Sequence, residues 1–315
     1  MSSADWKVWV DTGGTFTDCI AIDPQEQRHR VKVLSSSALR GTLSERLGPR
    51  SYRVDQEWSA PNDFISGFRF RLLNREHREV EVTRYNADRS MVTLDRSLQT
   101  THNIGASFEV VSDEAAPVLA ARLVTATPAG ETLPPVDFRL ATTKGTNALL
   151  ERTGAPTALF VTDGYADLLD IGRQERPNLF ALEIDKSPPL YEHVVEVDER
   201  LNADGSVHRP LDVSALEEEI EALVDAGIES AAIAFLHSYQ NPVHEEQVAE
   251  LLREKGMEYV SVSSNLSSSI KIIPRAETAL VNAYLEPVID TYLEGVRAHM
   301  SAGRLDVMTS AGGVV

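Results

Sequence analysis

Cysteine, basic residues and long apolar runs are all scarce in this chain. Of its 315 residues only Cys19 is a cysteine, so no disulfide can form within the chain. It has no apolar stretch of about 18 residues and no signal-peptide pattern, so the sequence predicts a soluble, cytoplasmic protein. Lys and Arg number 30 against 48 Asp and Glu, a net charge of −18, which argues against nucleic acid or an anionic membrane as a partner.

Several common catalytic motifs are missing as well. Neither a Walker loop, G-x-x-x-x-G-K-[ST], nor a dinucleotide fingerprint, G-x-G-x-x-G, precedes a predicted helix. His237 and His244 lack further ligands at the spacing of a zinc site. No Ser-His-Asp or Cys-His arrangement is legible, and Cys19 lies in an apolar run, where packing is the favoured interpretation. The sequence therefore names no general base.

The most informative segment is residues 10–18, which read V-D-T-G-G-T-F-T-D. The apolar run Trp6–Val10 precedes it, and the chain alternates again over Phe16–Ile22. Two such runs joined by Gly13 and Gly14 predict a tight β-hairpin. A strand, and not a helix, is expected after the turn, which separates this segment from the other common phosphate loops.

The turn is unusually rich in groups that suit a phosphate and a metal ion. Its hydroxyls and glycines are predicted to hold the phosphates of a nucleotide, and they are Thr12, Gly13, Gly14, Thr15 and Thr17. Asp11, at the end of the strand, is predicted to hold Mg²⁺ directly or through water and is the first candidate catalytic residue. Asp18 is also assigned to the phosphate site, with capping of the turn as an equal alternative. A purely structural hairpin is the competing interpretation of the whole segment.

The pattern D-x-G-x-T between two antiparallel strands resembles the first phosphate site of the actin-like ATPase superfamily, which includes sugar kinases and actin. On this basis residues 1–39 are expected to hold the first hairpin and the next strand of an α/β, ribonuclease H-like lobe with a mixed sheet. Residues 40–112 are rich in arginine and β-formers and are interpreted as a small inserted antiparallel β module. The strands expected in it are Phe64–Leu73, Glu79–Tyr85, Met91–Leu94 and Ser107–Val111.

Residues 113–315 are expected to continue the α/β lobe and to stop before a second lobe. Helical spacing predicts helices at Val213–Ala226, Val243–Lys255 and Pro274–Ser301. The continuous apolar run Ala231–Leu236 between the first two predicts a buried strand of a parallel sheet. Shorter helices are expected at residues 114–126 and Tyr165–Ile171.

A polar turn at Thr142–Asn147 lies between the predicted strand Phe138–Thr142 and a predicted helix. A helix N-terminus suits an anion, and Lys144 adds positive charge, so Lys144 is assigned a catalytic role. Its neighbours are assigned to substrate binding, namely Thr143, Gly145, Thr146 and Asn147. Plain N-capping by Thr143 or Thr146 is the alternative. Arg173 and Arg176 are candidates to bind a substrate carboxylate bidentately, and salt bridges to acidic residues are the equal alternative.

Several segments, in order, resemble the N-terminal region of the hydantoinase A / 5-oxoprolinase family. They are Asp11–Asp18, Ala141–Arg152, Asp170–Pro177, Phe235–Glu245, Asn282–Leu285 with Pro287, and Ser310–Gly313. Lys144-Gly145 and the stretch Asn178–Lys186 look most like the 5-oxoprolinase-type branch. No segment of the insert carries the resemblance.

The resemblance implies an actin-like ATPase fold and ATP-driven chemistry on a cyclic amide. The reaction expected is 5-oxoproline with ATP and water giving glutamate, ADP and phosphate, with Mg²⁺ and often K⁺ as cofactors. The partners expected are the cyclic amide and either a C-terminal remainder of the polypeptide or a hydantoinase B-like subunit. The chain alone is expected to bind nucleotide weakly and to be inactive.

Other functions stay open at this point. An ATP-dependent hydantoinase or a ketone carboxylase subunit uses the same activation on another substrate. A small-molecule kinase of the same superfamily, a non-catalytic actin-like scaffold and a homo-oligomer are also compatible with the pattern.

Overall fold

The computed structural model describes residues 6–73, 79–98, 104–173, 180, 187–309 and 312–315. The chain forms two compact units. Unit 1 consists of Met1–Lys144 and Tyr292–Val315, and unit 2 consists of Gly145–Thr291. In the part of the chain described here, no helix is both long and apolar enough to cross a membrane.

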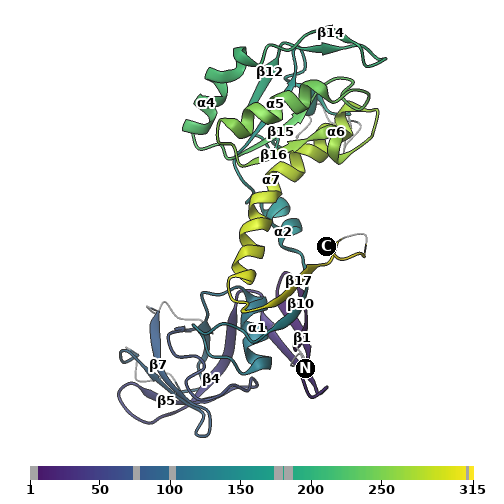
Figure 1. Cartoon of the computed structure of the whole chain (residues 1–315). Helices are drawn as coiled ribbons and strands as arrows, with labels where there is room; N and C mark the ends of the chain where they lie inside the picture. The colour runs from purple at the N-terminus through teal and green to yellow at the C-terminus, as the bar shows by residue number, and fades with distance from the viewer. Residues whose placement is uncertain (1–5, 74–78, 99–103, 174–179, 181–186, 310–311) are drawn as a thin grey trace. The chain divides into compact units, whose positions relative to one another are not determined.

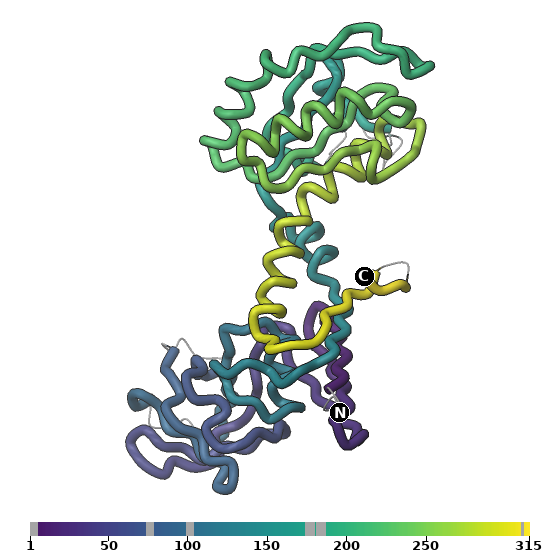
Figure 2. The backbone as a smooth tube through the Cα atoms, viewed as in Figure 1, coloured from purple at the N-terminus to yellow at the C-terminus, as the bar shows by residue number. Residues whose placement is uncertain are grey.

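Unit 1 is built on a five-stranded mixed sheet with the strand order β17-β10-β1-β2-β3. The strands are β1 (Trp6–Thr12), β2 (Phe16–Ile22), β3 (Arg28–Leu34), β10 (Val136–Thr142) and β17 (Gly303–Val307). The first three form an antiparallel meander, and β10 and β17 run parallel to β1. Figures 1 and 2 show these segments, far apart in the sequence, running side by side. The predicted hairpin and mixed sheet are confirmed.

One face of this sheet carries the core of unit 1. Alternate residues of the hairpin, among them Val8, Val10 and Cys19, are buried there against helix α1 (Ala116–Thr125). The period of two places Asp11 and Asp18 on the opposite, open face. Cys19 is fully buried, and burial raises the pKa of its thiol to about 12, so its predicted packing role is confirmed.

The inserted β module is a closed barrel of six strands, in the order β4-β5-β8-β7-β6-β9. They are β4 (Ala38–Arg46), β5 (Ser51–Asp55), β6 (Arg69–Leu72), β7 (Val80–Asn86), β8 (Met91–Leu94) and β9 (Ser107–Val111). The sequence analysis does not predict β4, whose buried positions do not alternate, or β5, which alternates over only five residues. The strand predicted at Phe64–Leu73 is too long, since only Arg69–Leu72 is a strand.

A buried carboxylate ties the strands of the module together. Glu109 is 3% exposed and accepts hydrogen bonds from Arg40 (2.8 Å) and Arg71 (2.6 Å). Burial alone raises the pKa of this carboxyl, but the hydrogen bonds and charges of Arg71 and Arg40 outweigh burial and hold the pKa of Glu109 below its ordinary value. The charge is therefore a structural part of the barrel.

Unit 2 holds a four-stranded parallel sheet with the order β12-β11-β15-β16. Its strands are β11 (Thr157–Thr162), β12 (His193–Val197), β15 (Ser230–Ala234) and β16 (Tyr259–Val262), with a hairpin of β13 (Arg200–Leu201) and β14 (Val207–Arg209). The helices are α3 (Leu168–Ile171), η1 (Val213–Leu216), α4 (Glu217–Asp225), α5 (Val243–Glu254) and α6 (Ser263–Leu266). Helices α2 (Lys144–Glu151) and α7 (Ile272–Arg297) contain the boundaries of the two units.

The parallel sheet is confirmed, and some of its elements differ from the prediction. The helix expected at Tyr165–Ile171 is reduced to α3, one short turn. The helix expected at Val213–Ala226 begins as a 3₁₀ turn, as helix ends often do, and the Asp212 carboxylate accepts the Ser214 N–H at 3.1 Å. Strands β12 to β14 are not predicted by the sequence pattern.

Candidate functional site

The turn between β1 and β2 is tight and leaves backbone donors without a partner among the described residues. Asp11 pairs with Asp18 in the register and Thr12 with Thr17. The Gly13 N–H donates to the Phe16 carbonyl at 3.0 Å, which closes the turn. The N–H groups of the exposed Gly14 and Thr15 donate to no described residue. Consecutive backbone N–H groups without a protein partner are donors that an anion can use.

Asp11 stands at the end of β1, immediately before this turn. Its side chain is exposed and forms no hydrogen bond or ion pair with any residue that the structure describes. A carboxylate oxygen without a protein partner is an oxygen ligand that Mg²⁺ accepts. Among the described residues no group of three or more His, Cys, Asp or Glu is placed to hold a metal ion. An ion at Asp11 would therefore need water and phosphate oxygens as its other ligands, as Mg²⁺ commonly has.

Asp18 lies across from Asp11 but is already engaged. Lys32 on β3 donates to its carboxylate at 3.0 Å, and the Arg30 guanidinium lies 3.5 Å away. The hydrogen bond from Lys32 is the main cause that holds the pKa of Asp18 below its ordinary value. The structure thus gives Asp18 partners on the neighbouring strand and none in the turn.

Ser35, which follows β3, supports the β1–β2 turn through hydrogen bonds. The sequence pattern does not distinguish this residue. Its hydroxyl donates to the Gly13 carbonyl at 2.7 Å, and its N–H donates to the Thr15 carbonyl at 2.9 Å. The Thr17 hydroxyl is fully buried, 3.0 Å from the Ser35 Oγ. Since a hydroxyl has one proton, Thr17 must donate to Ser35. Thr17 therefore holds the turn in place, and its hydroxyl does not reach the solvent side of the turn.

The end of β10 meets the same turn. The Thr143 N–H and hydroxyl donate to the Thr12 carbonyl at 3.0 and 3.3 Å, and the Tyr292 hydroxyl lies 3.4 Å from the Thr12 Oγ1. The Lys144 N–H, at the start of α2, donates to the Thr142 hydroxyl at 3.1 Å. Within unit 1 the fold thus brings the predicted residues 11–15 together with Thr143 and the backbone of Lys144.

The remaining predicted residues belong to unit 2. Gly145, Thr146 and Asn147 lie in the first turn of α2. The Arg173 guanidinium forms an ion pair with Glu277 at 2.7 Å, the alternative that the sequence left open. Both side chains are about half exposed, where such a pair is worth about 0–1 kcal/mol, so Arg173 can exchange this partner at little cost. Arg176, and all of residues 178–186 except Phe180, lie outside the described residues.

Unit 2 also holds a buried polar network at the loop that follows β15. Arg275 is fully buried and donates to the Phe235 carbonyl at 2.6 Å and to the Ser238 hydroxyl at 2.9 Å. The Glu245 carboxylate accepts the Phe235 N–H at 2.8 Å. The Nδ1 of the buried His244 lies 2.6 Å from the buried Glu199 carboxylate. These groups fix the loop that follows β15, and no sequence pattern distinguishes them from exposed helix charges.

Comparison with known proteins identifies the family. The family model described as Hydantoinase/oxoprolinase N-terminal region matches residues 7–84 and 91–256. The chain belongs to this family. It is 36% identical over its full length to 5-oxoprolinase of Saccharomyces cerevisiae, and half of it is 43% identical to 5-oxoprolinase 1 of Arabidopsis thaliana. Half of it is also 35% identical to the acetophenone carboxylase gamma subunit of Aromatoleum aromaticum. The matches span 22%, 14% and 24% of these relatives' lengths, respectively.

Two solved structures share the fold of this hydantoinase/oxoprolinase chain. Nucleotide-free acetone carboxylase matches 99% of the chain and 37% of its own, with a TM-score of 0.57 at 18% identity. The ATP-dependent caprolactamase from Pseudomonas jessenii matches 98% and 36%, with a TM-score of 0.57 at 22% identity. The predicted fold class is confirmed: an α/β actin-like lobe with a mixed sheet and an inserted antiparallel β module.

Proposed function

We propose that this chain is the ATP-binding N-terminal portion of an ATP-dependent cyclic amidohydrolase of the 5-oxoprolinase type. The reaction proposed is 5-oxoproline, ATP and water giving glutamate, ADP and phosphate. The observation that carries the proposal is the β1–β2 turn, where the unpaired N–H groups of Gly14 and Thr15 adjoin the unpartnered carboxylate of Asp11. The identity to yeast 5-oxoprolinase over the whole chain supports the choice of substrate.

The residues of the turn fit a metal-bound nucleotide. Asp11 would hold Mg²⁺ directly or through a water molecule, and the ion when bound neutralises charge on the phosphates. The N–H groups of Gly14 and Thr15 and the Thr15 hydroxyl would donate to phosphate oxygens. Lys144 would add a positive charge beside the turn. Thr17 and Ser35 would keep the backbone of the turn in place and would not touch the nucleotide. K⁺ stays a prediction of the family resemblance.

The chemistry explains why ATP is needed to open a lactam. An amide carbonyl is a poor electrophile, so its oxygen first attacks the γ-phosphorus and ADP leaves. Water then adds to the activated carbon and the ring C–N bond breaks, which leaves an acyl phosphate and the free amine. A second water molecule hydrolyses the acyl phosphate and releases phosphate, which leaves the two carboxylates and the amine of glutamate. Donors aimed at the γ-phosphate stabilise the charge that develops during the transfer. Arg173 would bind the substrate carboxylate.

A second candidate is a subunit of an ATP-dependent ketone carboxylase. The 35% identity of half the chain to an acetophenone carboxylase gamma subunit favours it. A hydantoinase, a kinase and an actin-like scaffold remain further alternatives. A kinase would retain a phosphorylated product, and a scaffold would bind nucleotide without any dependence on substrate.

The test begins with MgATP binding to this chain, measured by calorimetry, for the wild type and Asp11→Ala. Asp88→Ala, which removes an exposed carboxylate in the module, is the matched control. We expect weak binding that Asp11→Ala abolishes and Asp88→Ala leaves unchanged. The chain is then co-expressed with the remainder of a relative, and ATP hydrolysis is measured with and without 5-oxoproline. ATP hydrolysis that 5-oxoproline does not stimulate would refute the proposed substrate, and equal binding by wild type and Asp11→Ala would refute the proposed site.

A further inference from the structure

The outer edge of β3 carries backbone groups that no strand occupies. Among the strands that the structure describes, β3 is the last of its sheet and pairs with β2 alone. At the two ends of this ladder the Asp23 N–H donates to the Gln27 carbonyl and the Ser35 N–H to the Thr15 carbonyl. Since hydrogen-bonded pairs alternate along an antiparallel ladder, odd-numbered residues of β3 turn their backbone to β2. The N–H and C=O groups of Arg30 and Lys32 therefore point outward, and no described residue bonds to them.

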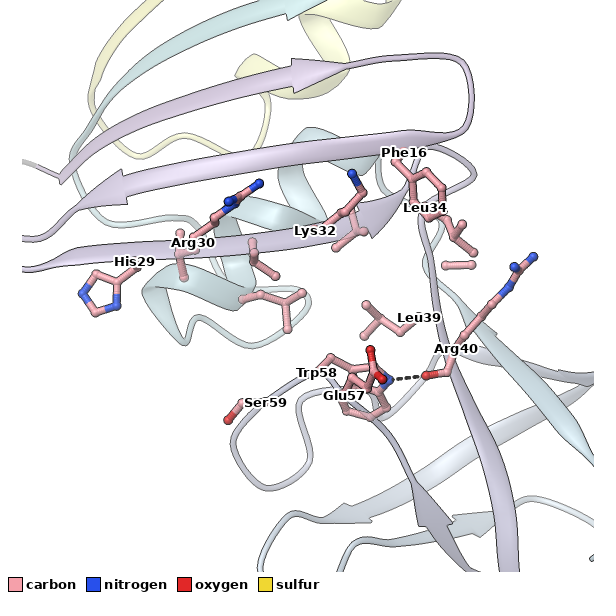
Figure 3. Close-up of a pocket in the computed structure, with 15 residues that line it drawn as sticks. Phe16, His29, Arg30, Lys32, Leu34, Leu39, Arg40, Glu57, Trp58 and Ser59 are labelled. Atoms are coloured by element: carbon pink, nitrogen blue, oxygen red, sulfur yellow. Dashed lines mark hydrogen bonds between the residues drawn. The ribbon is translucent and has the colours of Figure 1, made fainter. Parts of the chain in front are cut away.

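A groove runs along this edge (Figure 3). Its volume is about 670 Å³, within the range of about 300–1,000 Å³ typical of binding clefts. The strand lines one side, and Trp58 with its neighbours in the module lines another, its indole N–H held by the Arg40 carbonyl at 2.8 Å. Leu123 and Val124 from the end of α1 supply an apolar wall. The groove lies wholly within unit 1.

The groove is basic in an acidic protein. Its lining holds the cations Arg30, Lys32 and Arg40 against the single carboxylate of Glu57. Over residues 28–54 the chain carries seven Lys and Arg and one Glu, whereas the whole chain has a net charge of −18. Arg30 and Lys32 pair with Asp18, and Arg40 pairs with Glu109. All three cationic side chains are nevertheless more than half exposed, so they can also meet a charge on an incoming chain. The charge complementarity favours an acidic partner.

These cations also argue against a second copy of this chain as the occupant. Charged residues on an edge strand commonly prevent pairing between identical edges. An antiparallel register centred on Val31 sets Arg30 of one copy against Lys32 of the other, and like charges directly opposite are destabilising. Prevention of edge-to-edge pairing would explain the cations by itself. It would not explain the groove walls formed by Trp58, Leu123 and Val124.

We propose that the edge of β3 is a docking site for an extended acidic segment of another protein, which adds to the sheet as a sixth strand. Its backbone would bond to the outward N–H and C=O groups of Arg30 and Lys32. Alternate side chains would be carboxylates, because they lie on the face that carries Arg30 and Lys32. The intervening side chains would be apolar, because they face Leu123 and Val124.

The experiment uses a fluorescein-labelled peptide of nine residues that alternates Glu and Val, with a Lys–Val peptide of equal length as control. Binding to the full chain is measured by fluorescence anisotropy at low salt. We expect the Glu–Val peptide to bind at least about tenfold more tightly than the Lys–Val peptide. Arg30→Glu is expected to remove this preference, and Arg46→Glu, the same charge change outside the groove, to leave it intact. Two further peptides carry N-methyl groups on alternate residues, one on the odd-numbered and one on the even-numbered residues. Methylation of the N–H groups that face β3 should abolish binding, and methylation of those that face away should leave it intact.

Hydrogen exchange by NMR adds an internal control. The amides of Arg30 and Lys32 should be slowed by the Glu–Val peptide, and that of Val31, already bonded to β2, should be unchanged. Binding that survives both methylation patterns would overturn the proposal, as would unchanged exchange at Arg30 and Lys32. Failure of both peptides to bind at about 1 mM, or dimerisation of the chain through β3, would also overturn it.

Discussion

Replacing Ser35 by alanine tests how the β1–β2 turn is held. The substitution removes the hydroxyl that donates to the Gly13 carbonyl at 2.7 Å and leaves the fully buried Thr17 hydroxyl without an acceptor. A buried donor left unsatisfied costs about 1–3 kcal/mol, so the free energy of unfolding of unit 1 should fall by that amount. Ser36→Ala is the matched control, because Ser36 is exposed and should change stability by less than about 0.5 kcal/mol.

The assay is urea denaturation followed by tryptophan fluorescence, which reports on unit 1 because Trp6, Trp9 and Trp58 all lie in it. The double variant Thr17→Val with Ser35→Ala should recover part of the loss, since both partners are then apolar. The affinity for MgATP should weaken several-fold in Ser35→Ala and stay unchanged in Ser36→Ala. Equal stability of the two single variants, or no recovery in the double variant, would refute the inferred hydrogen bonds.

Four further outcomes are expected. The Cys19 thiol should resist iodoacetamide at pH 8 in the folded chain and react after denaturation, because burial raises its pKa to about 12; mass spectrometry counts the adducts, and labelling of the native chain would contradict this. Glu109→Gln should lower the free energy of unfolding at pH 7 by about 3 kcal/mol, and the difference from wild type should shrink below pH 4.5, the ordinary value of a carboxyl whose folded-state pKa is lowered here; a pH-independent difference in urea titrations would exclude this account. Arg275→Met should destabilise unit 2 by about 3 kcal/mol or more because it orphans buried acceptors, as hydrogen exchange in β15 can measure, and unchanged protection there would show the network to be dispensable. Gly303→Ala should unfold the edge at β17, since its φ is +108° and a Cβ would lie 1.9 Å from the Val136 carbonyl oxygen; a wild-type melting temperature would argue against that geometry.

The parts of the fold that the sequence predicts are those with strong local signals. Two glycines between alternating runs predict the β1–β2 hairpin, and the apolar run at Ala231 predicts a buried parallel strand. Strand β5 escapes prediction because its alternation covers only five residues, with the exposed Arg53 between the buried Tyr52 and Val54. Strand β4 escapes prediction because its buried positions do not alternate. The long helix is predicted at Pro274–Ser301, and its described bounds are Ile272–Arg297.

Only part of the candidate site can be predicted from the sequence, because some of its contacts join residues that are far apart in the chain. Residues 11–15 are contiguous and recognisable, and the approach of Thr143 follows from β10 pairing in parallel with β1. The support from Ser35 depends on a contact across 22 residues, and nothing distinguishes it from Ser36 or Ser37 in the chain. Asp18 looks like a turn residue, and only the pairing of β2 with β3 reveals Lys32 and Arg30 as its partners.

The burial of Cys19 has a practical consequence for spectroscopy. Because the only native thiol is shielded in the core of unit 1, the wild-type chain already serves as a background free of reactive cysteine. A single cysteine introduced at an exposed position, such as Ser36 next to Ser35, would be the one site that accepts a spin label or a fluorophore. Each unit can thus be labelled at a chosen residue without first re-engineering the core.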